Sequence, residues 1–113
     1  MGELVQFPGV GDLVRQRPSK PLVIENTHQD GAHWVLLSGE LDFSNARSIP
    51  DHLLALAHYG DVVVDVSGVT FIDADGLAVL VEGRRLVEWE GGRFEVRGAK
   101  GLMARLLGVA GSD

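Results

Sequence analysis

A run of valines in the middle of the chain constrains the fold more than any other feature. Residues 62–66 read Val-Val-Val-Asp-Val, a pattern typical of a strand in a parallel sheet with helices on both faces. Gly68 breaks the run, and Phe71 and Ile72 bring the chain back to the core. An acidic turn, residues 73–76, then opens a helix. The sequence therefore predicts a strand, a tight turn and a helix at the centre of an α/β domain.

The segments around this unit predict a β-β-α-β-α-β-α order. A short strand at 22–25, a turn at 29–31 and a strand at 33–41 are expected to form a hairpin. Further along, we expect a helix at 77–89, a last strand at 93–97 and a short helix around 102–107. Helical connections predict a mixed sheet of about four strands, in which the central strand is parallel to both neighbours, residues 35–37 and 94–96.

The start of the first helix has two possible forms, and a glycine in the second helix predicts a close contact. Apolar residues from Ala46 onward fall on one helical face, but Pro50 interrupts the pattern. Either Ser48 caps a helix that begins near Pro50, or a longer helix is kinked there. In the second helix, Gly83 is expected to allow a close approach to the sheet.

Length and charge narrow the class of protein. The chain has 113 residues, which predicts one domain at 21–113 preceded by an arm at 1–20. A net charge of −6 gives no electrostatic basis for binding nucleic acid or an anionic membrane, and absence of cysteine excludes disulfides. No apolar run approaches a membrane span or a signal peptide. We therefore expect a cytoplasmic protein, without membrane insertion, whose partners are proteins or small molecules.

Two short acidic motifs stand ahead of predicted helices. The first is Gly39-Glu40-Leu41-Asp42, and the second is Phe71-Ile72-Asp73-x-x-Gly76-Leu77 after the valine strand. Together they resemble the STAS domain of bacterial anti-sigma-factor antagonists. The resemblance runs from about Pro21 to Val109, with every element in the same order. It implies a small α/β STAS-like domain.

The resemblance also implies a function without catalysis or cofactor. Such antagonists bind an anti-sigma factor of the serine-kinase type and so regulate sigma-factor-dependent transcription. Phosphorylation of a serine at the helix start abolishes binding. The family's usual run is Asp-Ser-Ser-Gly-Leu, with the second serine as phosphoacceptor, and Asp75 stands at that position here. By resemblance, the partner-binding residues are Asp42, Asp73, Ala74, Asp75, Gly76 and Leu77.

The sequence does not decide whether Asp75 gives the binding or the non-binding state, because aspartate does not accept phosphate as serine does. Asp75 either makes binding constitutive or holds the domain in the non-binding state. Ser67 and Thr70 are other hydroxyls near the turn. Asp73 and Asp75 also suit a helix start, where a carboxylate cap contributes about 1 kcal/mol.

Two other functions compete for these residues. The first is a STAS module of another complex, such as a lipid-transport assembly. The second is a small haloacid-dehalogenase-like phosphatase, with Asp73 as nucleophile and Asp75 as acid or base beside Mg²⁺. Lys100 is the only lysine after the motif, and Asp113 the only later aspartate, so the usual helpers are missing. The four histidines have no i, i+4 pair, and we expect no metal site.

Overall fold

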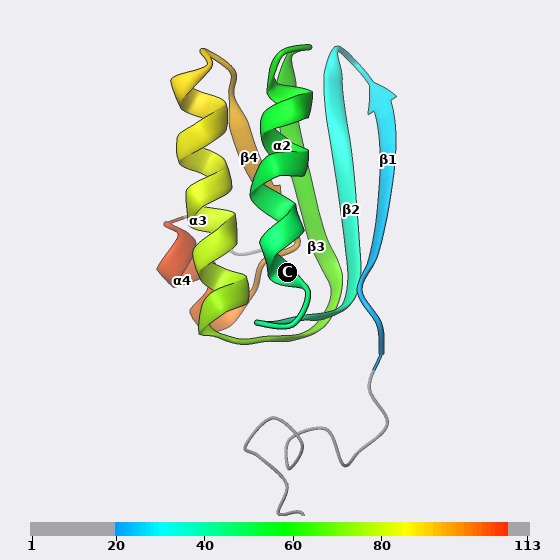
Figure 1. Ribbon diagram of the computed structural model, residues 1–113, viewed down its shortest axis with the longest axis vertical. Helices are drawn as coiled ribbons and strands as arrows, with labels where there is room; N and C mark the ends of the chain where they lie inside the picture. The colour runs from blue at the N-terminus through cyan, green and yellow to red at the C-terminus, as the bar shows by residue number, and fades with distance from the viewer. Residues whose placement is uncertain (1–19, 109–113) are drawn as a thin grey trace, which may run out of the picture.

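The structure is a computed structural model that describes residues 20–108, in which helices pack on a four-stranded sheet (Figure 1). The strands are β1 (Val23–Gln29), β2 (Ala32–Leu41), β3 (Asp61–Ile72) and β4 (Phe94–Arg97). The helices are α2 (Ile49–Ala57), α3 (Ala74–Trp89) and α4 (Gly101–Leu107). The expected arm, residues 1–20, lies outside the described residues except for Lys20. None of the described helices is long and apolar enough to cross a membrane.

The sheet has the predicted topology. Its strand order is β1-β2-β3-β4, with β3 parallel to both β2 and β4. β1 pairs antiparallel with β2 through a two-residue turn, Asp30 and Gly31. Both turn residues have positive φ, 53° and 77°, as a type I′ hairpin turn requires. The predicted hairpin and the predicted central strand are therefore confirmed.

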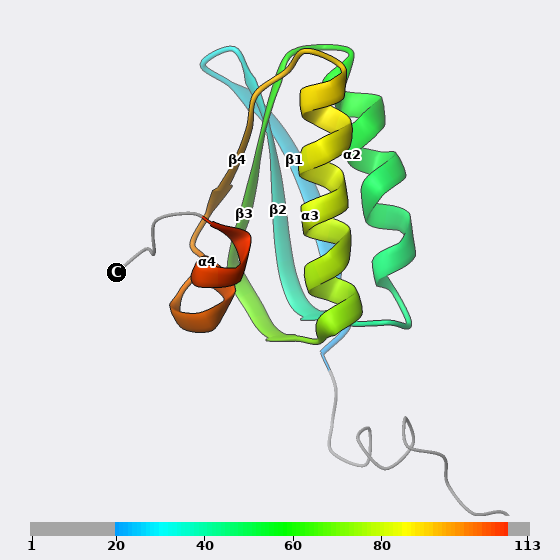
Figure 2. The same ribbon diagram turned by 90° about the vertical axis from the view of Figure 1, so that its left-hand side faces the viewer.

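The helices are not distributed as the valine run suggested. α2 and α3 both cover one face of the sheet, and α4 lies beyond the β4 edge (Figure 2). Among residues 20–108, no helix covers the opposite face. Arg97 on that face reaches across β3, and its guanidinium lies 5.4 Å from the ring centroid of Trp34. Val63, in β3, is only 7% exposed, so neighbouring side chains bury this valine where a second helical layer was expected.

β3 is longer than the valine run and continues through Gly68 to Ile72. Its register against β2 shifts twice, and each time β3 uses one residue more than β2. Gly68 does not break the strand, because it faces Ser38 at a place where a Cβ atom would lie 2.8 Å from the serine Cβ. The missing side chain lets the two strands stay paired there.

Residues close to each helix start determine where α2 and α3 begin. A 3-10 turn, Ala46–Ser48, leads into α2, and Pro50 occupies the first helical turn, where its missing N–H costs nothing. The helix thus begins near Pro50 as one alternative expected, but the Ser48 side chain makes no cap hydrogen bond. α3 begins at Ala74, three residues before the predicted start, because Asp73 caps it.

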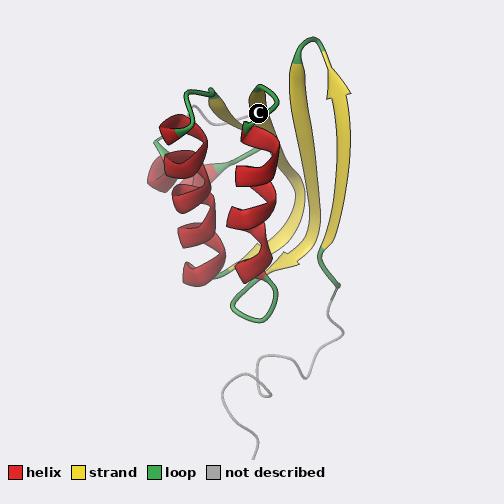
Figure 3. Cartoon of the chain, turned by 45° about the horizontal axis from the view of Figure 1, so that its top comes forward, coloured by secondary structure: helices red, strands yellow, loops and turns green. Residues whose placement is uncertain are grey.

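α2 and α3 lie side by side over the sheet (Figure 3). The buried residues of α3 recur at helical spacing, which gives the helix one face against the core: Gly76, Leu80, Gly83 and Val87. Gly83 allows a close approach, but to α2 and not to the sheet. A Cβ atom at this position would collide with the Leu53 side chain of α2. This contact fixes the spacing between the two helices.

Candidate functional site

The candidate site lies where β2 and β3 end. These strands run parallel, and their last residues, Leu41 and Ile72, are register partners. The acidic residues that follow them, Asp42 and Asp73, therefore enter neighbouring loops at the same edge of the sheet. This is the edge at which open α/β sheets commonly place their sites.

Asp42 organises the first loop from a buried position, with 3% of its surface exposed. Its Oδ1 accepts hydrogen bonds from the Ser44 amide (2.9 Å) and the Ser44 hydroxyl (2.6 Å). Its own amide donates to Asn45 Oδ1 at 3.0 Å, and its carbonyl accepts from the Ala46 amide at 2.8 Å. These contacts make Asp42 part of the loop's internal frame.

Asp73 links that loop to α3. Its Oδ1 accepts a hydrogen bond from the Gly76 amide at 2.8 Å, as a helix N-cap does. Its Oδ2 accepts from the Phe43 amide at 3.0 Å, thirty residues away in the sequence. One carboxylate thus fixes both the start of the helix and the position of the neighbouring loop.

Gly76 and Leu77 are packing residues of the same junction. Gly76 is buried, and a Cβ atom there would collide with the Leu41 carbonyl oxygen at the end of β2. Leu77 is partly buried against the core. Of the six predicted contact residues, Ala74 and Asp75 are therefore the two that are exposed.

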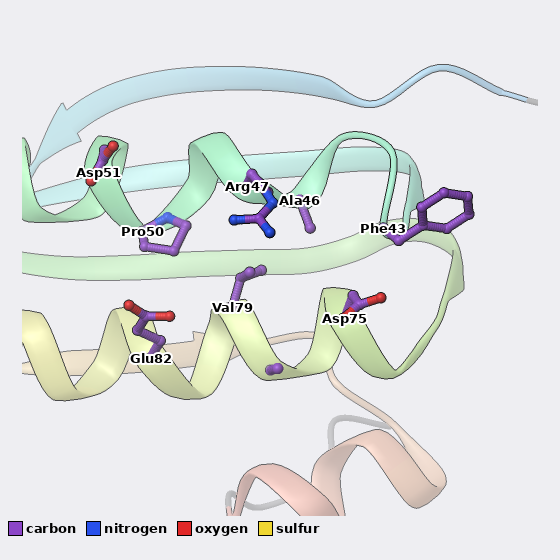
Figure 4. A pocket seen from close by; sticks show the side chains of 9 residues that line it. Phe43, Ala46, Arg47, Pro50, Asp51, Asp75, Val79 and Glu82 are labelled. Carbon is purple, nitrogen blue, oxygen red and sulfur yellow. The ribbon is translucent and has the colours of Figure 1, made fainter.

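Asp75 lies in the first turn of α3, beside an aromatic side chain that the sequence motifs did not indicate. Phe43 is 58% exposed and lies near Asp75 at one end of a groove between α2 and α3 (Figure 4). The groove has a volume of about 600 Å³. Its nine lining residues are Phe43, Ala46, Arg47, Pro50, Asp51, Asp75, Ala78, Val79 and Glu82. The one signal for Phe43 in the sequence is its place directly after the first acidic motif.

The other hydroxyl candidates lie away from the helix start. Ser67 donates from its Oγ to Asp65 Oδ1 at 2.6 Å, and Thr70 donates from its Oγ1 to the Gly39 carbonyl at 3.3 Å. Both belong to β3. In residues 20–108, no three His, Cys, Asp or Glu side chains are arranged to hold a metal ion.

The fold and the site together define a class: a small α/β domain that presents an acidic helix start and an exposed aromatic residue at one sheet edge. The family model "Mlab, STAS domain" matches residues 24–113. The chain therefore belongs to the STAS domain family.

Comparison with individual proteins gives the same family and adds a role for the relatives. The anti-sigma F factor antagonist of Paenibacillus polymyxa is 30% identical over 93 residues, which cover 80% of each chain. A solved anti-sigma factor antagonist from Mycobacterium paratuberculosis is 27% identical, with a TM-score of 0.62, and the match covers 76% of this chain and 74% of that one. Unphosphorylated SpoIIAA, an anti-sigma factor antagonist, is 17% identical with a TM-score of 0.66 over 82% of this chain and 88% of its own, and shows the shared fold.

A similar fold also occurs inside a larger protein. The solved structure of Mglu is 27% identical, with a TM-score of 0.58 over 64% of this chain. This chain covers only 18% of the length of Mglu. That likeness therefore concerns one part of Mglu and not the whole of it.

Proposed function

We propose that this protein is an anti-sigma-factor antagonist that binds a kinase-type anti-sigma factor in the cytoplasm and so regulates sigma-factor-dependent transcription. It acts by binding and carries out no reaction itself. Asp75 occupies the place of the phosphoacceptor serine and keeps the protein in its binding state. The partner surface is the acidic start of α3, residues 73–77, together with the loop at Asp42.

The exposure of Asp75 is the observation that carries the proposal. The carboxylates of Asp42 and Asp73 accept hydrogen bonds from backbone amides of the site, whereas the Asp75 carboxylate makes no hydrogen bond or ion pair with any residue from 20 to 108. It is exposed in the first turn of α3. A partner that docks at this edge of the sheet meets the Asp75 carboxylate directly.

The state of the switch follows from the charge of this group. Aspartate carries one negative charge and two oxygens, whereas phosphoserine carries roughly −1.5 to −2 and three oxygens, so Asp75 is only a partial mimic. A basic side chain of the partner would form a charge-assisted contact with it. Because no phosphate can be added at Asp75 as at a serine, such binding is constitutive.

Binding measurements on three proteins test this mechanism. Kinase-type anti-sigma factors from the source genome are purified, and their affinities for wild type, Asp75→Ser and Asp75→Ala are measured by titration calorimetry. We expect both substitutions to weaken binding by about tenfold or more, which corresponds to about 1.4 kcal/mol. Glu88→Ser, an exposed acidic position at the other end of α3, is the matched control and should bind like wild type.

The opposite result has a distinct signature. If Asp75→Ser binds more tightly, and the anti-sigma factor with ATP then phosphorylates the new serine and releases it, Asp75 holds the domain in the non-binding state. If none of the anti-sigma factors binds any form of the protein, the antagonist role itself is wrong.

The description of the matching family model supports a second candidate. It names Mlab and not an anti-sigma factor antagonist. In this alternative, the protein is a STAS module of another complex, such as a lipid-transport assembly, and binds its partner through the same surface. Affinity capture from the native cytoplasm, followed by mass spectrometry and reconstitution with the purified component, distinguishes the two. A transporter component that binds through Asp75 would favour the second candidate.

A further inference from the structure

The groove between α2 and α3 extends the Asp75 surface along the two helices. α3 contributes Asp75, Val79 and Glu82 at i, i+4 and i+7, which places them on one face of the helix. Seven residues of helix rise about 10.5 Å, so the groove is two helical turns long between its acidic ends. α2 and the turn before it form the other wall, with Pro50 and Asp51.

Charges in the groove are unbalanced. Asp51 and Glu82 come from opposite walls near one end, and Asp75 lies with Phe43 near the other, with Arg47 between them (Figure 4). The lining of the groove thus includes three carboxylates and one guanidinium. No ion pair or hydrogen bond to a residue in 20–108 involves the side chains of Asp51, Asp75 or Glu82. Their negative charge is therefore available to a partner.

The walls around Arg47 in the middle of the groove are apolar. Pro50 and Ala46 are buried in its wall, and Val79 is partly exposed. An apolar side chain that enters there removes this surface from water at about 25 cal/mol per Å². The groove therefore combines apolar walls around Arg47 with one carboxylate from each helix near its far end.

We propose that the groove is the specificity site for the anti-sigma factor and receives a segment with a basic side chain between Asp51 and Glu82 and an apolar side chain against Val79. This inference rests on the proposed function, since it concerns the same partner, but it uses residues beyond the acidic helix start. Complementary charge selects such a segment and speeds its association. Arg47 opposes a basic segment and limits its affinity.

A second copy of this chain fits the groove less well. The protein carries a net charge of −6, so two copies repel each other at an acidic surface. Light scattering coupled to size-exclusion chromatography at several concentrations tests this directly. Self-association that Glu82→Lys changes would show that a second copy is the occupant and would overturn the proposal.

Charge substitutions with opposite expected signs test the proposal with the anti-sigma factor as the probe. Glu82→Lys and Asp51→Asn should weaken binding about tenfold and about threefold, mainly through slower association at low salt. Arg47→Gln should tighten it about threefold. Glu88→Lys, which makes the same charge change on α3 outside the groove, should bind within twofold of wild type.

The results separate this inference from the antagonist role. If wild type binds, Asp75 variants weaken binding and the groove variants behave like Glu88→Lys, the proposed function stands and the groove inference is wrong. Weaker binding of Arg47→Gln would also overturn it, because the partner would then present an acidic group. Circular dichroism of each variant checks that folding is retained, and Asp51→Asn keeps the test valid if Glu82→Lys unfolds the protein. If no anti-sigma factor binds any form of the protein, both the antagonist role and the groove inference are wrong.

Discussion

Replacing Asp73 should separate its two structural roles. Alanine removes both hydrogen bonds that the carboxylate accepts, from the Gly76 amide at 2.8 Å and from the Phe43 amide at 3.0 Å. Asparagine keeps one acceptor oxygen and is as good an N-cap as aspartate. Its amide NH₂ group cannot accept a bond from the second N–H, so Asp73→Asn loses the link to the loop and retains the helix cap.

The expected costs follow from these contacts. Loss of an N-cap costs about 1 kcal/mol, and a hydrogen bond to a charged group contributes about 1.5 kcal/mol, reduced to about 1 kcal/mol where one partner is exposed. We therefore expect about 2 kcal/mol for Asp73→Ala and about 1 kcal/mol for Asp73→Asn. With a urea m-value of about 1–2 kcal/mol per M, Asp73→Ala lowers the midpoint by about 1–2 M.

Urea unfolding followed by circular dichroism measures the stabilities, and amide hydrogen exchange separates the two bonds. In Asp73→Asn, the Phe43 amide should lose protection while the Gly76 amide keeps it. In Asp73→Ala, both should lose protection. A cost below about 0.5 kcal/mol for Asp73→Ala, or a protected Phe43 amide in either variant, would refute the two-bond account.

Three further predictions concern the helix contact, the aromatic residue and catalysis. Gly83→Ala should destabilise the fold by about 1–2 kcal/mol in thermal or urea unfolding, because overpacking against Leu53 outweighs the gain of about 1 kcal/mol in helix propensity; Leu53→Val in the same chain should recover part of it, and a more stable single variant would contradict the close contact. Phe43→Ala should weaken anti-sigma factor binding at least tenfold in calorimetry with little change in stability, because an exposed aromatic anchor contributes mainly to the interface; unchanged affinity would exclude it from the surface. The protein with Mg²⁺ should not hydrolyse p-nitrophenyl phosphate, because both oxygens of Asp73 already accept backbone hydrogen bonds; turnover that Asp73→Asn abolishes would restore the phosphatase alternative.

The order of the strands could be predicted because it depends on features that are local in sequence. The valine run, the Asp30-Gly31 turn and the helical spacing after Gly76 each specify one element, and the handedness of crossovers then leaves few topologies. What covers the second face could not be predicted in this way. A buried valine such as Val63 has the same sequence pattern whether a helix or the Arg97 and Trp34 side chains lie nearby.

The place of the three acidic residues in the fold could be predicted, but their separate structural roles could not. The motifs brought Asp42, Asp73 and Asp75 to one edge, where the structure has them. Sequence does not tell which carboxylate is buried, because that depends on the Phe43 amide thirty residues from Asp73 and on the loop around Asp42. Phe43 and Glu82 were missed because the groove forms only when α2 and α3 pack together.

The two register shifts between β2 and β3 also restrict how the chain can change in length. At each shift, near Gly68 and near Thr70, β3 contains one residue more than β2. Deleting one residue there would turn every later side chain of the strand to the opposite face and draw the Asp73 carboxylate back by about 3.3 Å from the Phe43 amide. In an alignment of related chains, a one-residue gap at this place would mark a protein in which the two loops are no longer joined. Insertions at the Asp30-Gly31 turn, at the other end of the sheet, carry no such penalty.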